Sequence, residues 1–353
     1  MLDIKHLLQL AATRNASDLH LVVGLPPIFR VDGELFSLDE ILKKKGEGEI
    51  INEQELQESV GLLLSPEQKT KFFVERDLDI SYALNDLRFR INLSYEKGNM
   101  KMVARVITDE QPTLEQIGMP QVVYDLLNLP QGLILLTGPT GCGKSTTLAA
   151  MINYINNNRS CNIVTFEDPI EFLFKSNKSV ITQRQLGSDM SSFAKGLKYV
   201  LRQDPNVIMI GEMRDLETIA AAITIAETGH LVLATLHTFN AAQTVDRIID
   251  IFPPHQQNQV RSQLSLILAG VISQRLLPKI GGGRVAAREI MVKTPAVANL
   301  IRENKIAQLR SVLQTSGADG MMTLDKHLQE LFHQGLITKE VAMGQMENPN
   351  ELA

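Results

Sequence analysis

The sequence predicts an α/β fold in which a smaller α+β domain precedes a larger domain built on a mostly parallel sheet. Two observations support this prediction. From residue 132 onward, short and nearly all-apolar segments alternate with helical patterns, as expected of parallel strands covered on both faces. Before residue 108, short strand patterns, a hairpin signal and helical patterns are mixed. The chain has 353 residues, enough for about two domains.

The first domain is expected over residues 1–108. Capping patterns mark its helix starts, such as Asn52 followed by Glu55. A Glu-Lys-Gly-Asn turn at 96–99 lies between two strand patterns and predicts a hairpin. The elements expected are a helix over 4–12, strands over 19–23 and 28–31, helices from 52 to 64 and from 65, and a hairpin that pairs 88–93 with 100–107.

The stretch 109–131 contains three prolines and is expected to be a linker that carries a short helix. The larger domain is expected over 132–294, followed by a helical segment over 295–353. Its predicted parallel strands are 132–137, 161–166, 206–211 and 230–236.

The run Gly-Pro-Thr-Gly-Cys-Gly-Lys-Ser-Thr at 138–146 matches the phosphate-binding pattern G-x-x-x-x-G-K-[ST]. It lies between a predicted strand and a good helix sequence, so backbone N–H groups and the helix dipole can both face an anion. Lys144 is expected to reach the outer phosphates, and Ser145 to hold Mg²⁺. The nucleotide-binding residues predicted are Gly138, Pro139, Thr140, Gly141, Cys142, Gly143, Lys144, Ser145 and Thr146.

A carboxylate follows strand 206–211, at the edge of the sheet where the phosphate-binding loop 138–146 (the P-loop) also lies. This residue, Glu212, occupies the Walker B position, but Gly211 stands where an aspartate normally supports the metal. Glu212 is therefore predicted to orient the attacking water, to support the Mg²⁺ shell, or to do both.

Three further carboxylates follow strand 161–166: Glu167, Asp168 and Glu171. They are candidates for the carboxylate that Gly211 does not supply, with Asp168 near the metal. For catalysis the sequence favours one of Glu167 and Glu171 without deciding between them.

Two histidines flank strand 230–236. Because His230 and His237 are seven residues apart, their side chains are expected on opposite faces of the strand, which argues against a metal pair. His237, at the carboxyl end, is predicted to hydrogen-bond the γ-phosphate and to sense its loss. His230, at the amino end, is predicted to make a structural hydrogen bond.

Composition narrows the possible partners. The net charge is −5, and the chain lacks the basic footprint that nucleic-acid motors carry. Its basic run, at 43–45, is interpreted as a solvated loop. Two cysteines exclude a disulfide scaffold and a four-cysteine zinc site. No apolar run approaches the length of a membrane span, so a cytoplasmic protein is expected. Because of the net charge, no nucleic-acid partner is expected.

Taken together, these motifs resemble the secretion ATPase superfamily, and most closely the type IV pilus retraction ATPases of the PilT family. The segments that carry the resemblance span nearly the whole chain. They are Ser17-Asp18-Leu19-His20-Leu21, the P-loop at 138–146, the acidic run at 165–171, the Walker B run at 204–215 and the histidine run at 227–238. The number of cysteines and the lack of a large N-terminal extension favour the retraction branch of the superfamily.

This resemblance implies a RecA-like P-loop ATPase domain and a PAS-like N-terminal domain in a homohexamer, with ATP and Mg²⁺ bound between the domains. It implies that Arg88, Arg90 and Arg105 approach the phosphates as the ring closes; surface salt bridging is the alternative. It also implies a location at the cytoplasmic face of the inner membrane, with peripheral association through a pilus platform protein.

One departure from the family lies at 296–303, Ala-Val-Ala-Asn-Leu-Ile-Arg-Glu, where Ala298 replaces the first arginine of the family motif. An accessory retraction paralogue, or a motor for another secretion filament, is therefore an alternative to a self-sufficient retraction motor. A RecA-like nucleic-acid motor and a nucleotide-gated scaffold are further alternatives, and the charge and the set of motifs argue against them.

The second departure is Cys142, which replaces the usual small hydroxyl residue or alanine in the P-loop. A thiol at a helix N-terminus is expected to have a lowered pKa. The sequence therefore predicts that alkylation of Cys142 inactivates the protein and that Mg-ATP protects it.

Overall fold

The computed structural model describes all residues except 1, 32, 44–49, 86, 108–110 and 353. Lys44 and Lys45 of the expected basic loop therefore lie outside the described residues. The chain divides into two compact units. The smaller unit comprises Met1–Glu110 with Glu171–Leu173, and the larger unit comprises Gln111–Ile170 with Phe174–Ala353. The two units are described separately below.

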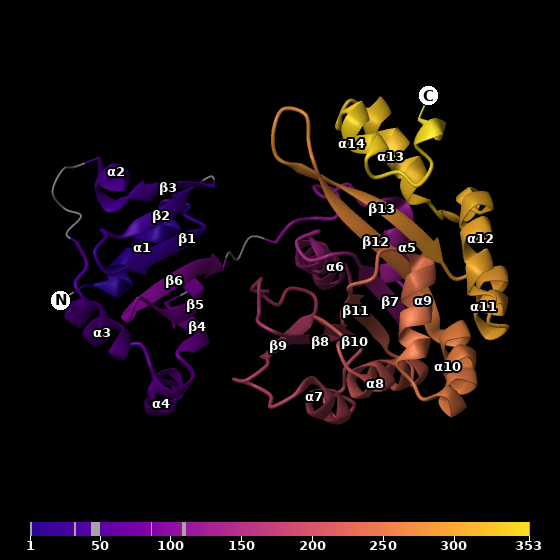
Figure 1. Ribbon diagram of the computed structural model, residues 1–353. Coiled ribbons are helices and arrows are strands. Elements are labelled where there is room, and N and C mark those ends of the chain that lie inside the picture. Colours follow the sequence, from indigo (N-terminus) through magenta and orange to yellow (C-terminus); the bar gives the residue numbers. More distant parts are fainter. Residues whose placement is uncertain (1, 32, 44–49, 86, 108–110, 353) are drawn as a thin grey trace. The chain divides into compact units, whose positions relative to one another are not determined.

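The smaller unit is an antiparallel sheet with helices, as the hairpin and capping signals predicted (Figure 1). The strands lie in the order β3-β2-β1-β6-β5-β4. Three elements were not predicted: β3, α2 and β4. The elements are α1 (Ile4–Thr13), β1 (Asp18–Val22), β2 (Ile28–Val31), β3 (Glu34–Ser37), α2 (Leu38–Leu42), α3 (Glu53–Gly61), α4 (Pro66–Glu75), β4 (Asp77–Leu84), β5 (Leu87–Glu96) and β6 (Asn99–Ile107).

Alternation along β5 sets the two faces of this sheet. Phe89, Ile91 and Leu93 are fully buried in a core that they share with α1 and α3. Arg88 and Arg90 lie on the opposite face because successive side chains of a strand point to opposite sides. The helix expected from 52 to 64 is capped by the Asn52 side chain but already ends at residue 61.

The larger unit contains a seven-stranded sheet in the order β13-β12-β7-β11-β10-β8-β9, in which only the β12–β13 pair is antiparallel. Helices lie on both sides of this sheet (Figure 1). Its elements up to residue 292 are α5 (Gln121–Leu127), β7 (Gly132–Thr137), α6 (Lys144–Asn158), β8 (Asn162–Glu167), β9 (Val180–Gln185), α7 (Phe193–Val200), β10 (Val207–Ile210), α8 (Leu216–Glu227), β11 (Leu231–Leu236), α9 (Ala241–Asp250), α10 (Pro254–Ile267), β12 (Leu268–Pro278) and β13 (Arg284–Val292).

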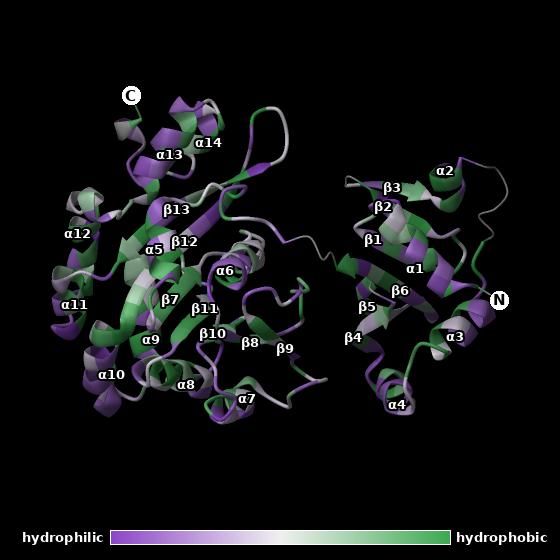
Figure 2. Ribbon diagram, turned by 180° about the vertical axis from the view of Figure 1, so that it is seen from behind, coloured by the Kyte–Doolittle hydropathy of each residue, from purple (hydrophilic) through white to green (hydrophobic). Residues whose placement is uncertain are grey.

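The central strands match the sequence prediction because they are buried on both faces. Every residue of β7, β11 and β10 is buried, and Figure 2 shows these strands as hydrophobic ribbons behind more hydrophilic outer helices. The four predicted strands begin and end within one residue of the observed ones. The α/β prediction is therefore confirmed, although β9, β12 and β13 were not predicted.

The stretch 111–131 groups with the larger unit. Its apolar side chains, including Leu114, Met119, Val123 and Leu127, are buried in the main core of that unit. The prolines of this stretch therefore flank a packed segment that carries α5.

The end of the chain is helical, as predicted. It contains α11 (Pro295–Arg302), α12 (Leu309–Thr315), α13 (Leu324–His333), α14 (Lys339–Met343) and the 3₁₀ turns Ile306–Gln308, Gly317–Asp319 and Pro349–Glu351. Helices α13 and α14 pack on the β12–β13 hairpin through a separate small core. Among the described residues, no helix is both long and apolar enough to cross a membrane.

Candidate active site at the carboxyl edge of the larger sheet

The P-loop follows β7, and its shape depends on two glycines. Gly138 has φ +143°, and a Cβ added there would lie 2.2 Å from the backbone oxygen of Gln274. Gly143, with φ +87°, is the N-cap of α6, and no side chain caps this helix in the structure. The N-cap residue therefore brings no side chain to the first turn of α6, an arrangement that suits an anion at this end of the helix.

The Lys144 side chain folds back onto the P-loop. Its Nζ donates to the carbonyl oxygens of Gly138 (2.7 Å) and Pro139 (3.1 Å) and lies 3.5 Å from Nδ1 of His237. The cation is therefore held at the mouth of the loop, next to the histidine that ends the neighbouring strand.

Strand order brings the predicted polar residues together. β11 lies between β7 and β10, so His237 and Glu212 follow neighbouring strands at the P-loop edge. His237 Nε2 lies 2.9 Å from Oε1 of Glu212, which also lies 2.8 Å from Nε of Arg214. Lys144, His237, Glu212 and Arg214 thus form one continuous polar chain.

The environment of Glu212 favours its charged form. Burial opposes ionisation, but hydrogen bonds and charge from Arg214 and His237 outweigh it and hold the pKa of Glu212 below its ordinary value. A carboxylate suits both predicted roles, orienting water and supporting Mg²⁺. Gly211 is also explained, since a Cβ at this position would lie 3.1 Å from the backbone oxygen of Phe166.

The three carboxylates after β8 have different surroundings. Glu167 is buried and accepts from Oγ1 of Thr165 (2.6 Å) and Nε2 of Gln183 (3.0 Å). Asp168 is exposed, and its charge contributes to the raised pKa of Arg214 after the larger effects of the Glu212 hydrogen bond and charge. Glu171 is exposed and groups with the smaller unit. The structure thus places Asp168 near the Glu212–Arg214 pair, while Glu167 is engaged within the sheet.

The donors expected for Mg²⁺ are the hydroxyl of Ser145 and the carboxylates of Glu212 and Asp168. Ser145 lies in the first turn of α6, directly after Lys144. Among the described residues, no group of three or more His, Cys, Asp or Glu side chains could hold a metal ion. Mg²⁺ at a nucleotide site takes one or two protein oxygens besides phosphate and water, so the residues present fit this ion.

The three predicted arginines share the polar face of the smaller sheet. Arg105 is paired with Arg90 across β5 and β6. Nε of Arg105 lies 2.9 Å from Oδ1 of the buried Asp18, and Nη2 of Arg90 lies 3.6 Å from Oδ2 of Asp79. Arg88 lies on the same face and is half-buried. Two of the three arginines therefore form salt bridges within the smaller unit.

The prediction of a lowered thiol pKa for Cys142 was wrong. The side chain is 3% exposed, and burial raises the pKa of its thiol despite the opposing charge of Lys144. Its sulfur lies close to Gly138, where an added Cβ would be 2.7 Å from Sγ. The sequence motif gave no indication that this side chain would be buried.

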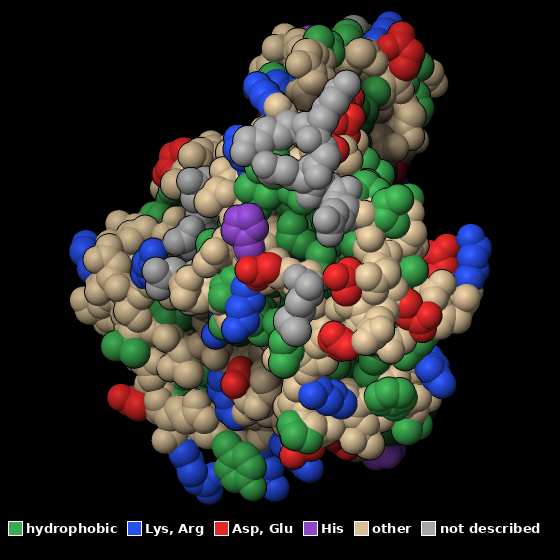
Figure 3. Space-filling view, turned by 90° about the vertical axis from the view of Figure 1, so that its left-hand side faces the viewer, with side chains coloured by type: hydrophobic (Ala, Val, Ile, Leu, Met, Phe, Trp, Pro, Cys, Tyr) green, Lys and Arg blue, Asp and Glu red, His purple; other side chains and the backbone are tan. Residues whose placement is uncertain are grey.

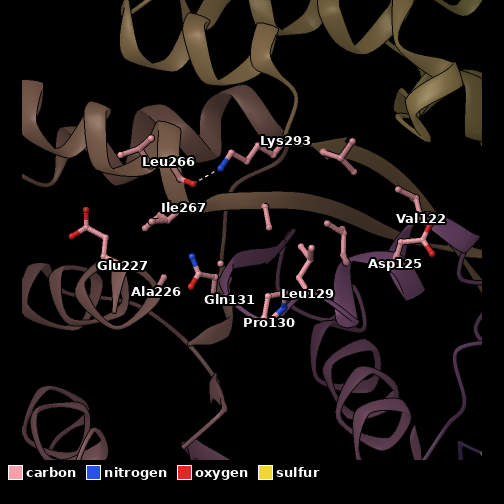
Figure 4. A pocket seen from close by; sticks show the side chains of 14 residues that line it. Val122, Asp125, Leu129, Pro130, Gln131, Ala226, Glu227, Leu266, Ile267 and Lys293 are labelled. Carbon is pink, nitrogen blue, oxygen red and sulfur yellow. Dashed lines mark hydrogen bonds between the residues drawn. The ribbon is translucent and has the colours of Figure 1, made fainter. Parts of the chain in front are cut away.

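His230 makes the structural hydrogen bonds predicted for it. Nδ1 lies 3.1 Å from the Ile225 carbonyl oxygen and 3.2 Å from Oγ1 of Thr228, at the amino end of β11. A cavity of about 650 Å³ also lies at this amino edge, away from the P-loop (Figure 4). Glu227, Gln131 and Lys293 lie around it, and Lys293 donates to the Leu266 carbonyl oxygen.

Sequence reasoning missed Arg214 and Gln274 as site residues. Arg214 is two residues after Glu212, so the Walker B run itself offered the signal. Gln274 contacts the P-loop from β12, a strand that was not predicted. Its only sequence signal is a polar residue within an apolar segment.

Comparisons with known proteins agree with this geometry. The family model for the type II/IV secretion system protein matches residues 3–335. The chain is 46% identical over 351 residues to the type IV pilus retraction ATPase PilT of Pseudomonas aeruginosa, covering 99% of both chains. It is also 46% identical to a twitching motility protein of Neisseria gonorrhoeae, over 93% of this chain and 86% of the relative.

A solved structure of the pilus retraction motor PilT with bound ADP is 45% identical to this chain, with a TM-score of 0.91. The match covers 100% of this chain and 99% of that structure. Since the family model, the full-length identity and the fold all agree, the chain belongs to the type II/IV secretion system protein family and is an ATPase.

Proposed function

We propose that this chain is a hexameric, Mg²⁺-dependent ATPase motor that powers type IV pilus retraction. The observation that carries the proposal is the continuous chain Lys144–His237–Glu212 at the P-loop edge. The chain is similar over nearly its full length to a retraction ATPase and to a twitching motility protein, which supports a role for its ATPase activity in pilus retraction. ADP in the PilT structure makes an adenine nucleotide the expected substrate.

In the proposed reaction, water attacks the γ-phosphorus of ATP and the bond to the bridging oxygen breaks, giving ADP, phosphate and a proton. Lys144 leaves the carbonyl oxygens of Gly138 and Pro139 to bind the outer phosphates. Glu212, kept ionised by its neighbours, orients the water and accepts its hydrogen bond. His237 lies between Lys144 and Glu212, where it can sense whether the γ-phosphate is present.

Mg²⁺ would be held by Ser145 together with Glu212 or Asp168 and would offset the phosphate charge. Arg88, Arg90 and Arg105 of the smaller unit would complete the site when the subunits of the ring close. Repeated closure would move one unit against the next and drive a platform protein at the cytoplasmic face of the inner membrane.

Glu212→Gln tests the chemical part of this proposal. We expect turnover to fall at least about a hundredfold, since the carboxylate that orients water is lost, while nucleotide binding is kept. Steady-state ATPase activity and ADP binding are the measurements. Glu217→Gln removes an exposed carboxylate from the nearby helix α8 and is the matched control. Full activity in Glu212→Gln would contradict the role assigned to Glu212.

Twitching motility tests the biological part. A strain that lacks its retraction ATPase is complemented with the wild-type chain or with Glu212→Gln, and we expect only the wild type to restore twitching. An expressed, ATPase-active wild type that fails to rescue would favour an accessory role or another filament. Stimulation by single-stranded DNA would favour a nucleic-acid motor, and absence of turnover would favour a scaffold.

One observation keeps the accessory role open. In α11 the buried face is formed by Val297 and Ile301, whereas Ala298 is half-exposed. The packing of the helix therefore does not require alanine at this position, and replacement of the family's arginine there changes a surface that a partner could contact.

A further inference from the structure

A buried polar network beneath the P-loop takes no direct part in the proposed reaction. It begins at Gln274 of β12, which is 2% exposed. Nε2 of Gln274 donates to the Cys142 carbonyl oxygen (2.6 Å), and its Oε1 accepts from Oγ1 of Thr147 (3.0 Å). One side chain thus ties the tip of the P-loop to the first turns of α6.

This contact fixes the direction of one peptide group. In a trans peptide the C=O and the following N–H point in opposite directions. Since the Cys142 carbonyl oxygen is held toward Gln274, the Gly143 N–H points away from β12, to the opposite side of the loop. Gln274 therefore orients one of the N–H groups that the motif supplies for phosphate binding.

Arg288 of β13 continues the network. It is 2% exposed, and Nε donates to Oε1 of Gln274 (3.1 Å). Its Nη2 and Nη1 atoms donate to the carbonyl oxygens of Ile117 (2.8 Å) and Gly118 (3.1 Å), respectively. The planar guanidinium therefore spans the P-loop support and the segment that enters the larger unit at residue 111.

Burying this charge is costly, and the described residues include no salt-bridge partner for it. Burial lowers the pKa of Arg288 to about 10, which leaves the side chain charged at neutral pH. Its backbone N–H donates to Nδ1 of His327 on α13 (2.9 Å). Burial and the Arg288 charge lower the pKa of His327 to about 4, so the acceptor stays neutral.

We propose that Arg288 and Gln274 are positioning residues that couple the entry segment 111–118 to the P-loop. Segment 111–118 begins the larger unit, so a shift of this segment is delivered to the carbonyl groups that Arg288 holds. Gln274 passes the shift to the Cys142–Gly143 peptide. The inference rests on the proposed nucleotide site, and it assigns to that site a connection to the segment with which the larger unit begins.

Hydrogen exchange of the full chain, read by mass spectrometry with and without Mg-ADP, tests the coupling. In the wild type we expect ADP to slow exchange in 138–147 and also in 111–118. If neither segment responds, the proposed nucleotide site fails. If 138–147 responds and 111–118 does not, the coupling is overturned while the nucleotide site stands.

Arg288→Met is expected to abolish the response of 111–118. Leu328→Ala is the matched control, because it opens a cavity in the α13 core without removing a hydrogen bond of the network, and it should keep both responses. Loss of the 111–118 response in Leu328→Ala as well would overturn the proposal. Arg288→Lys retains the charge, but one ammonium cannot reproduce the guanidinium fork, so the same loss is expected. A wild-type response in this milder variant would also overturn the proposal.

Gln274→Met adds no charge near the phosphates and removes the donor to Cys142. We expect the KM for ATP to rise about five- to tenfold with a smaller change in kcat, because one N–H donor to phosphate is no longer oriented. Since Gln274 and Arg288 act as one unit, the double variant should show no larger rise than Gln274→Met. The proposal would be contradicted if the double variant raised KM by the product of the two single effects. An unchanged KM in Gln274→Met would also contradict it.

Discussion

At the scale of single residues, Glu212 shows how neighbours set a charge state. Burial alone would favour the protonated acid, but Arg214 and His237 reverse this effect. Arg214 itself is 71% exposed, so its contribution comes from the direct contact at 2.8 Å. The polar chain at the P-loop edge therefore depends on Arg214, an exposed residue that can be substituted without changing the packing of the core.

The lowered pKa of Glu212 predicts a pH effect. If turnover needs the carboxylate, activity persists to lower pH than an ordinary glutamate would allow and falls as pH drops through the lowered pKa. Arg214→Met removes the main stabilising partner, so the pKa rises and the acid limb of kcat/KM moves to higher pH. Profiles of the wild type, Arg214→Met and the exposed-arginine control Arg202→Met measure the shift. An unmoved acid limb in Arg214→Met would argue against Glu212 as the titrating group.

The surroundings of Cys142 predict a thiol that reacts slowly with alkylating reagents. Because it is buried and its pKa is raised, iodoacetamide at neutral pH should modify the half-buried Cys161 before Cys142. The order should be the same with and without Mg-ADP. Peptide mass spectrometry of a labelling time course measures both sites in one sample, so each cysteine is the control for the other. Rapid, nucleotide-protected labelling of Cys142 would restore the expectation from its place in the motif.

At the scale of elements, the P-loop depends on close backbone contact with β12. We predict that Gly138→Ala abolishes nucleotide binding, since its Cβ would lie 2.2 Å from a backbone oxygen that cannot move freely. Gly141→Ala is the matched control, because φ is +79° but nothing lies within 4 Å of the added Cβ. It should cost only about 1–2 kcal/mol in the free energy of unfolding. Calorimetric ADP binding and thermal unfolding separate these outcomes, and strong ADP binding by Gly138→Ala would be inconsistent with the contact.

How far the sequence predicts each element depends on burial. β7, β10 and β11 are buried on both faces, so their apolar runs were visible, and the P-loop motif, Glu212 and His237 could be assigned to their ends. β9 is an edge strand with partly exposed residues, and β12 and β13 carry buried polar residues such as Gln274 and Arg288. These polar residues interrupt the apolar pattern by which a buried strand is predicted. They can be buried because distant segments of the chain supply their hydrogen-bond partners, and a single sequence does not reveal those partners.

At the scale of the whole molecule, the lysine and the arginines that are proposed to bind phosphate belong to different units. Lys144 belongs to the larger unit, while Arg88, Arg90 and Arg105 lie on one sheet face of the smaller unit. Figure 3 shows acidic and basic side chains interspersed on the face that it draws. Two explanations remain for the arginines that lie together on β5 and β6, a role in the site or salt bridging within the smaller unit.

The Arg105–Asp18 pair separates those two explanations. Arg105→Gln and Asp18→Asn both break the ion pair at 2.9 Å, but only the first removes the guanidinium. If Arg105 serves phosphoryl transfer, Arg105→Gln should lower kcat by about a hundredfold or more, whereas Asp18→Asn should retain most activity, since its arginine is free to turn to phosphate. Steady-state kinetics with thermal unfolding of both variants measure turnover and stability. Equal losses of activity and stability in the two variants would mean that Arg105 supports the smaller sheet alone, and the site would then be complete without it.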